Sequence, residues 1–387
     1  MAVWAKRRSR VMMLSLQILT PLCVRSGENA SAITDYIHDR KKRVVYLIDQ
    51  EKLNQWLMDQ GESARYLVKE IAAIASSQRG SLAHFFEGHN LSPHDFSQAI
   101  LPIAFPDSIT FRNWSLNLPT LTGRKPYIPG SSIKGAIRTA LMFDYIKKQN
   151  NGRLGYGATP HLPNSPRQLY YGSDIFCLPG KRSQYLPEND ALRFLQVTDT
   201  SPSPLESLRV YALERKGGSR NAIPNLLLGF YPGTEMKFEI NILSGYEKAN
   251  IPEYWKEFFA KGTATILKVI WEYSRLLLID EIERLNKKAH LEENKSLVQE
   301  YTRLLNENKN EIKQGGSLLR IGFGKTYYFN SIGYFLSNEE KEIYKSNWRR
   351  IKSVQEFPTT RWMIHTLENH YLPAGWSLLK QEKGDKN

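Results

Sequence analysis

The sequence has little cysteine, no long apolar run and no internal repeat, and each absence excludes a class of protein. Its two cysteines, Cys23 and Cys177, lie far apart in the chain, so they build neither a disulfide framework nor a CxxC metal site. A reducing compartment is therefore expected. No stretch reaches the roughly 18 uninterrupted apolar residues of a membrane span, so no membrane partner is expected.

The composition is that of a basic globular protein. The 387 residues carry 53 Lys and Arg against 39 Asp and Glu, which gives a formal net charge of +14. Such an excess favours a polyanionic partner, because each neutralised phosphate releases condensed counterions. The 20 Tyr, 16 Phe and 8 Trp offer surfaces on which unpaired bases could stack. A basic enzyme fits the composition equally well, so the choice between them depends on motifs.

The N-terminal segment has the outline of a secretory signal peptide. A basic cluster at residues 6–10 precedes an apolar stretch at residues 11–24, and small residues follow at 30–32. Polar residues interrupt this stretch, however, and Leu14, Leu16 and Ile18 alternate with other side chains as in a strand with one buried face. We therefore predict a first strand over residues 13–19 and a cytoplasmic location.

The remaining pattern predicts an α+β protein of about two or three domains. Apolar residues follow helical spacing over two stretches, 51–80 and 252–313. Short strand patterns occur at 44–48, 108–118, 192–197, 208–213, 236–242 and 318–321. Residues 150–190 are typical of an irregular insertion, and the last sixty or so residues show no strong pattern. We predict an N-terminal region at residues 1–250, with an insertion at about 50–125, and a mainly helical region at residues 251–387.

The clearest helix start in the chain lies near residue 130. A Pro-Gly turn precedes Ser131 and Ser132, which can cap a helix that continues to about residue 148. Lys134 and Arg138, four residues apart, share one face of its first turns. A helix N-terminus offers unpaired N–H groups and a partial positive charge, so this one, with two cations beside it, suits a phosphate. An ordinary capped helix with a solvated basic face remains the alternative.

Motifs for nucleotide hydrolysis and metal binding are weak. Gly324 and Lys325 look like the end of a phosphate-binding loop, but the glycine required five positions earlier is missing and an aromatic run follows. What remains is a glycine turn with a positive charge at Lys325. His84, His89 and His94 do not share a helical face and have no cysteine nearby. We therefore predict no metal site and no cofactor.

Residues 127–140, with the sequence YIPGSSIKGAIRTA, resemble a helix signature of the RAMP superfamily of CRISPR-associated proteins. Three weaker landmarks of the family also occur in this chain, in the order in which the family has them. Residues 18–28 (ILTPLCVRSGE) resemble the family's first strand and turn, and residues 194–200 (FLQVTDT) resemble a later strand. Residues 319–324 (LRIGFG) resemble its glycine-rich loop. Cys23 and Arg25 depart from the pattern, because relatives often have His and Gly at these places.

The resemblance implies a ferredoxin-like, or RRM-like, core with large insertions. Within the superfamily, the length and the order of landmarks are similar to those of the type III-A Csm subunit at the 3′ side of the guide RNA (crRNA). That similarity implies a non-catalytic subunit that binds crRNA beside the adjacent backbone RAMP subunit. It implies the other Csm complex subunits as partners, and a role in crRNA maturation and complex assembly. The expected RNA-binding residues, with Lys325 included for its charge, are Ser131, Ser132, Lys134, Arg138, Gly322, Gly324 and Lys325.

Two alternatives stay open. A RAMP-type endoribonuclease would have to use Asp199, Asp174 or a nearby histidine, although Asp199 more simply caps or turns the chain after its strand. A RAMP subunit from another position in the complex is the other alternative, and the chain length argues mildly against it. For RNA binding, we expect charge reversal of Lys134 and Arg138 to weaken RNA association without changing thermal stability. The hypothesis requires an exposed helix start on the same side of the molecule as the glycine turn.

Overall fold

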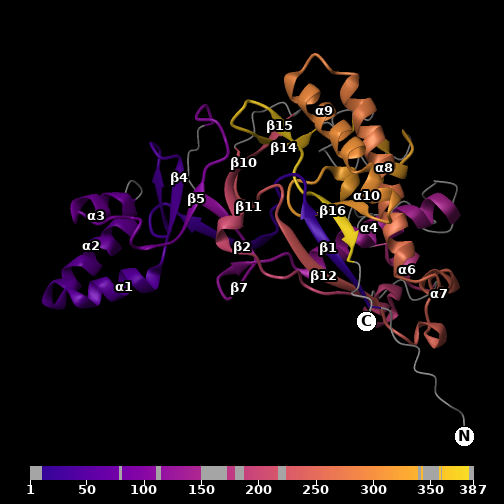
Figure 1. Ribbon diagram of the computed structural model, residues 1–387, viewed down its shortest axis with the longest axis horizontal. Coiled ribbons are helices and arrows are strands. Elements are labelled where there is room, and N and C mark those ends of the chain that lie inside the picture. The colour runs from indigo at the N-terminus through magenta and orange to yellow at the C-terminus, as the bar shows by residue number, and fades with distance from the viewer. Residues whose placement is uncertain are drawn as a thin grey trace, which may run out of the picture.

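The computed structural model describes residues 11–77, 81–109, 115–149, 172–178, 187–216, 224–338, 341–342, 357–358 and 360–382. Two large sheets stand side by side at the centre, with long helices on one side and a small α/β lobe on the other (Figure 1). The predicted α+β class is therefore confirmed. Within the described ranges, every helix is too short or too polar to span a membrane.

The first sheet has five strands in the order β13-β16-β1-β12-β9, and all neighbours are antiparallel. The central strand β1 buries Leu14, Leu16 and Ile18 on one face, which explains their alternation in the sequence. Its position confirms the predicted first strand to within one residue. The bounds are β1 (Met12–Ile18), β9 (Leu195–Val197), β12 (Glu235–Ile242), β13 (Ser317–Arg320) and β16 (Trp376–Gln381).

The second sheet has six strands in the order β15-β14-β10-β11-β6-β2. Strand β10 is buried on both faces: Val210 and Ala212 belong to the main core, whereas Tyr211 and Leu213 pack into a smaller cluster on the opposite face. This smaller cluster lies against the loops of the first sheet. The bounds are β2 (Arg25–Ser31), β6 (Ser115–Pro119), β10 (Leu208–Lys216), β11 (Asn225–Phe230), β14 (Arg361–His365) and β15 (Tyr371–Leu372).

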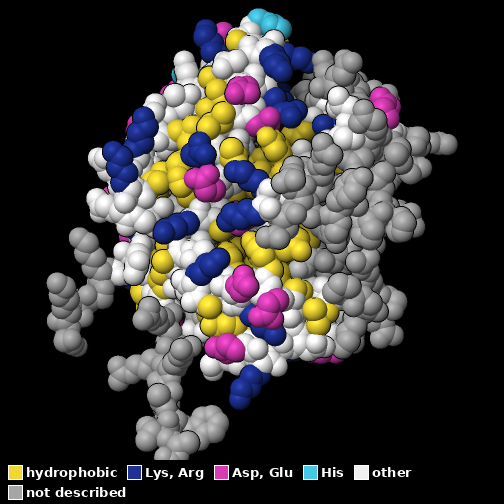
Figure 2. Space-filling view, turned by 90° about the vertical axis from the view of Figure 1, so that its right-hand side faces the viewer, with side chains coloured by type: hydrophobic (Ala, Val, Ile, Leu, Met, Phe, Trp, Pro, Cys, Tyr) yellow, Lys and Arg dark blue, Asp and Glu magenta, His cyan; other side chains and the backbone are white. Residues whose placement is uncertain are grey.

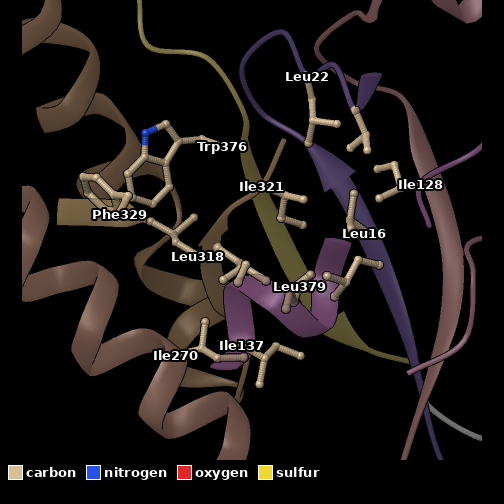
Figure 3. Packing of buried hydrophobic residues seen from close by; sticks show 14 of the residues in the cluster. Leu16, Leu22, Ile128, Ile137, Ile270, Leu318, Ile321, Phe329, Trp376 and Leu379 are labelled. Atoms are coloured by element: carbon tan, nitrogen blue, oxygen red, sulfur yellow. The ribbon is translucent and has the colours of Figure 1, made fainter. Parts of the chain in front are cut away.

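Two long helices, α4 (Gly130–Gln149) and α8 (Thr263–Asn286), pack against each other beside the first sheet. Figure 3 shows Leu16 of β1, Ile137 of α4 and Ile270 of α8 meeting in one core. The predicted helix from residue 130 to about 148 is confirmed. The predicted helical stretch 252–313 consists of α8 with α7 (Glu253–Ala260), α9 (Glu292–Glu307) and α10 (Lys309–Lys313), and the short α6 (Ser173–Phe176) lies nearby.

The C-terminal part of the chain contributes strands as well as helices. Strands β13 and β16, both beyond residue 250, lie in the sheet that contains β1, and β14 and β15 extend the second sheet. The segments 1–250 and 251–387 therefore share both sheets. The strands after residue 360 correspond to no pattern in the sequence, because each is short and two of them, β14 and β16, carry charged or polar side chains among the apolar ones.

The small lobe has its own core. It consists of a three-stranded sheet of β3 (Tyr36–Asp39), β4 (Val44–Ile48) and β5 (Ser97–Pro102), covered by α1 (Gln50–Asp59), α2 (Ala64–Ser76) and α3 (Leu82–Gly88). The lobe therefore begins before the insertion predicted at about residue 50. The single helical stretch predicted at 51–80 is two helices over its described part, because Gly61 has a φ of 59° and breaks it. Most of the predicted irregular segment 150–190 lies outside the described residues.

Candidate nucleic-acid interface

The loops that carry the sequence landmarks lie at one edge of the first sheet. Strands β1, β9 and β13 run in the same direction, because β12 and β16 are antiparallel to them on either side. Their C-terminal ends therefore meet at the same edge, which we call the loop edge (residues 19–25, 128–132, 198–200 and 321–325). Four strand spacings separate β9 from β13, or about 19 Å.

Helix α4 begins at the loop edge, directly against the end of β9. A Cβ atom on Gly130 would lie 2.4 Å from the Val197 carbonyl oxygen, so only glycine allows this approach. The hairpin of β7 (Leu121–Thr122) and β8 (Lys125–Pro126) leads into the helix. Ser131 is exposed and Ser132 is half-buried, so the start of the helix faces solvent.

Asp199 already occupies part of the helix N-terminus. Asp199 follows the end of β9, and its Oδ1 atom accepts a hydrogen bond of 2.7 Å from the Gly130 N–H. A carboxylate there stabilises the positive end of the helix dipole. Asp199 therefore caps this distant helix, whereas the sequence suggested a cap or turn directly after its own strand. A phosphate would have to bind next to it, at the half-buried and exposed serines.

The two cations in the first turns of the helix have different surroundings. Arg138 lies 2.7 Å from the Asp190 carboxylate, with only 17% and 5% of the two side chains exposed, and its guanidinium stacks on Phe176 at 4.2 Å. Lys134 is half-buried, and within the described ranges no carboxylate lies within ion-pair distance of it. Burial lowers the pKa of Lys134, Asp190 opposes that shift, and Arg138 adds to it. Of the two cations in the first turns of the helix, Lys134 is therefore the one available to a ligand.

The glycine-rich loop packs on the turn that follows β1. Gly322 has a φ of 83°, and a Cβ atom there would lie 2.4 Å from the Cys23 carbonyl oxygen. The same oxygen accepts a hydrogen bond of 2.8 Å from the Phe323 N–H. Gly324 also has a positive φ, of 92°. Both glycines are thus required by the backbone conformation and the close approach of two loops, whether or not a ligand binds.

A buried arginine, Arg320, is hydrogen-bonded to the glycine loop. Arg320 is only 1% exposed and donates hydrogen bonds to the carbonyl oxygens of Ala374, at 2.9 Å, and Gly324, at 3.3 Å. The next cation, Lys325, is half-buried. Burial lowers the pKa of Lys325 to about 8, and the charge of Arg320 contributes to the shift. Positive charge is therefore concentrated at the β13 end of the loop edge.

A comparison of the sequence with models of protein families supports the resemblance that the landmarks indicate. The family model for the RAMP superfamily matches residues 15–352, which is most of the chain. The chain belongs to the RAMP superfamily. In this RAMP protein the glycine loop, the first-strand turn and the helix signature occupy one edge of a single sheet.

Curated relatives and solved structures are similar to this RAMP protein over most of its length. The protein named "CRISPR system Cms protein Csm5" from Methanocaldococcus jannaschii is 23% identical over 407 residues, covering 96% of this chain and 89% of the relative. Its namesake from Streptococcus thermophilus is 23% identical over 247 residues, covering 61% and 65%.

Two solved structures share the fold. A chain in a cryo-EM structure of a type III-A Csm–crRNA–target RNA ternary complex has a TM-score of 0.69 at 20% identity, over 96% of this chain and all of that one. The crystal structure of Csm5 from T. onnurineus has a TM-score of 0.63 at 20% identity, over 94% and 99%.

The other candidate residues of this RAMP protein are dispersed. His84, His89 and His94 lie in or next to α3 of the small lobe, where His89 contacts Glu70 at 3.0 Å. Among the described residues, no group of three or more potential metal ligands gathers. The side chain of Asp174 lies outside what the structure describes.

Sequence reasoning missed Arg25 as a candidate ligand contact. Arg25 is exposed at the start of β2, beside the glycine loop, and its guanidinium carbon lies 3.6 Å from the centre of the Phe323 ring. Its departure from the family pattern was the available signal.

The helical side of the molecule, facing the viewer in Figure 2, mixes Lys and Arg with acidic and apolar side chains over its described surface. Basic residues there do not form one continuous patch.

Proposed function

We propose that this RAMP protein is a non-catalytic crRNA-binding subunit of a type III-A Csm complex. It lies at the 3′ side of the guide RNA, beside the adjacent backbone RAMP subunit, and supports crRNA maturation and complex assembly. The observation that carries the proposal is the convergence of the helix start, the first-strand turn and the glycine loop at the loop edge. The names of the curated relatives and their coverage of this chain support the choice of complex.

The fold proposal follows from the order of elements. Along the chain, β1, α4, β9, β12, α8 and β13 give the order β-α-β-β-α-β of a ferredoxin-like core, with β16 inserted between β13 and β1. The lobe of β3 to β5 and α1 to α3 then constitutes a large insertion within the N-terminal region 1–250. The C-terminal region 251–387 supplies the second core helix, the glycine loop and the strand β16.

The loop edge suits an RNA backbone better than a set of bases. At one end, Ser131 and Ser132 offer hydroxyl groups beside Lys134. At the other end, the turn of Gly322 and Gly324 packs on Cys23 and Leu213 and positions the half-buried cation of Lys325. Contacts of this kind hold phosphates and riboses and carry no sequence information directly. The proposal therefore predicts RNA binding with a strong dependence on salt and a weak dependence on sequence.

The salt dependence of affinity tests the proposal. For single-stranded RNA, each phosphate contact contributes about −0.7 to the slope of log K against log salt concentration. Lys134→Gln should reduce the steepness by about 0.7, whereas Lys147→Gln, an exposed lysine at the far end of the same helix, should leave it unchanged. Fluorescence anisotropy of the full chain with labelled crRNA measures both. Equal slopes for the wild type and both variants would refute a contact at Lys134.

Among the described residues, no contact favours the endoribonuclease alternative. Asp199, its leading residue, is engaged with the Gly130 N–H as a helix cap. A RAMP-type nuclease would need that carboxylate close to the scissile phosphate instead. Incubation of the purified protein with crRNA and with target RNA distinguishes the alternatives, since cleavage by the isolated chain would overturn the non-catalytic assignment.

A further inference from the structure

Two arginines and two aromatic rings form a contiguous row next to the glycine loop. The guanidinium of Arg25 lies over the Phe323 ring at 3.6 Å, the Phe323 and Trp362 ring centres are 5.6 Å apart, and the guanidinium of Arg215 lies 5.8 Å from Trp362. The four residues come from β2, the glycine loop, β14 and β10. Only the tertiary structure brings them together, since they are widely separated along the chain.

The sheet and the loop hold this row in place. Arg215 and Trp362 are directly opposite each other on β10 and β14. Phe323 and Trp362 pack partly against the smaller apolar cluster, on the same face as Leu213. Arg25 is further oriented by a hydrogen bond of 3.3 Å from its Nη1 atom to the Asn117 amide oxygen. The two aromatic rings are therefore held by the apolar cluster, and the side chains of Arg25 and Arg215 are exposed to solvent.

Among the described residues, no carboxylate neutralises the charges of this row. Within the described ranges, neither Arg25 nor Arg215 has a carboxylate within ion-pair distance, and both side chains are exposed. Two other stacked arginines are neutralised: Arg138 is paired with Asp190, and Arg284, over Tyr328, is paired with Asp280 at 2.6 Å. An exposed guanidinium that is fixed on a ring keeps one flat face open, and bases stack on such planes.

We propose that Arg25, Phe323, Trp362 and Arg215 form a stacking site for an unpaired base of single-stranded RNA. The site lies beside Gly322 and Gly324, so a strand whose backbone follows the glycine loop can turn a base onto it. Base stacking of this kind tolerates any sequence, because every base has a π face. The inference rests on the proposed RNA-binding function and adds a contact to the bases, whereas the loop edge addresses the backbone.

Comparing normal RNA with abasic RNA tests the site. The probes are a labelled single-stranded RNA of mixed sequence and the same ribose-phosphate chain without bases, each titrated with the full-length protein by fluorescence anisotropy. The wild type should bind the normal RNA about 5- to 150-fold more tightly, which corresponds to the usual contribution of one stacked base. Trp362→Leu and Phe323→Leu should remove most of this preference, and Trp362→Phe should retain it.

The controls separate the site from the proposed function. Tyr66→Leu changes a 72% exposed aromatic side chain on the small lobe and should leave the preference unchanged. If the wild type binds both RNAs equally and with a steep salt dependence, the stacking site is refuted and the backbone contacts stand. If it binds neither RNA, both proposals fail. The wild-type comparison decides the matter even if a leucine variant does not fold.

Discussion

Replacing Arg138 by glutamate should destabilise the fold as well as change a surface charge. The Arg138 guanidinium and the Asp190 carboxylate lie 2.7 Å apart and are 17% and 5% exposed, so the substitution leaves Asp190 buried beside a second carboxylate. Removing one partner of a buried ion pair costs about 3–5 kcal/mol. This changes the prediction made from the sequence, in which reversal of both helix cations left the thermal stability untouched.

The expected shift in melting temperature follows from the chain length. An unfolding entropy of about 2 cal/mol/K per residue gives about 0.8 kcal/mol/K for 387 residues that melt together. A loss of about 4 kcal/mol then lowers Tm by about 5 °C. Differential scanning calorimetry measures the shift, and Lys134→Glu, on the same helix without an ion-pair partner in the described ranges, should change Tm by much less.

A paired neutral substitution controls for the buried charge. The double variant Arg138→Gln with Asp190→Asn keeps polar groups of similar size without any charge, so it should recover most of the stability lost by Arg138→Glu. The reasoning is refuted if Arg138→Glu melts like the wild type. In that case the ion pair contributes nothing, and an RNA-binding defect of the variant could be attributed to a direct contact.

Three further predictions concern the loop edge. Gly130→Ala should destabilise the protein by about 1–3 kcal/mol, because the new Cβ would lie 2.4 Å from the Val197 oxygen. Gly135→Ala, in open space on the same helix, should stabilise it by about 0.5–1 kcal/mol, and urea unfolding that ranks them otherwise contradicts the packing argument. Asp199→Ala should cost about 1 kcal/mol by removing the cap, and Asp199→Asn less; an RNA-cleaving activity that disappears in both would instead assign a catalytic role. RNA affinity should fall as the pH rises through about 8, where Lys325 in the folded protein loses its proton. The free energy of unfolding should rise between pH 8 and pH 10.5, because Lys325 keeps its proton in the unfolded chain up to its ordinary pKa of 10.5. Lys325→Arg should abolish the change in affinity, and a wild type with unchanged affinity across this range would exclude Lys325 as a contact.

Local patterns predicted the elements whose residues repeat with a clear period. The alternation of Leu14, Leu16 and Ile18 predicted β1, because these positions form its buried face. The Pro-Gly turn before Ser131 and Ser132 predicted the start of α4. The strands β14, β15 and β16 were not predicted. They are short, and only their pairing with distant strands makes their residues strand-forming.

For the candidate site, the landmarks were visible in the sequence, but the contacts of each side chain were not. Serines, glycines and cations at residues 131–138 and 322–325 are visible as motifs, and the parallel directions of β1, β9 and β13 bring them to one edge. Nothing local distinguishes Lys134 from Arg138, yet one is unpaired within the described ranges and the other binds Asp190. The partner lies on a different segment, and sequence spacing carries no information about that contact.

The charge, the class of fold and the family signature could be predicted without a structure, because composition and periodicity are properties of neighbouring residues. The folded chain alone reveals that Asp199 caps α4, that Gly322 contacts Cys23, and that Arg25 stacks on Phe323. Each of these contacts joins segments far apart in the chain. They form when the burial of the shared core brings those segments together, since no local preference specifies them.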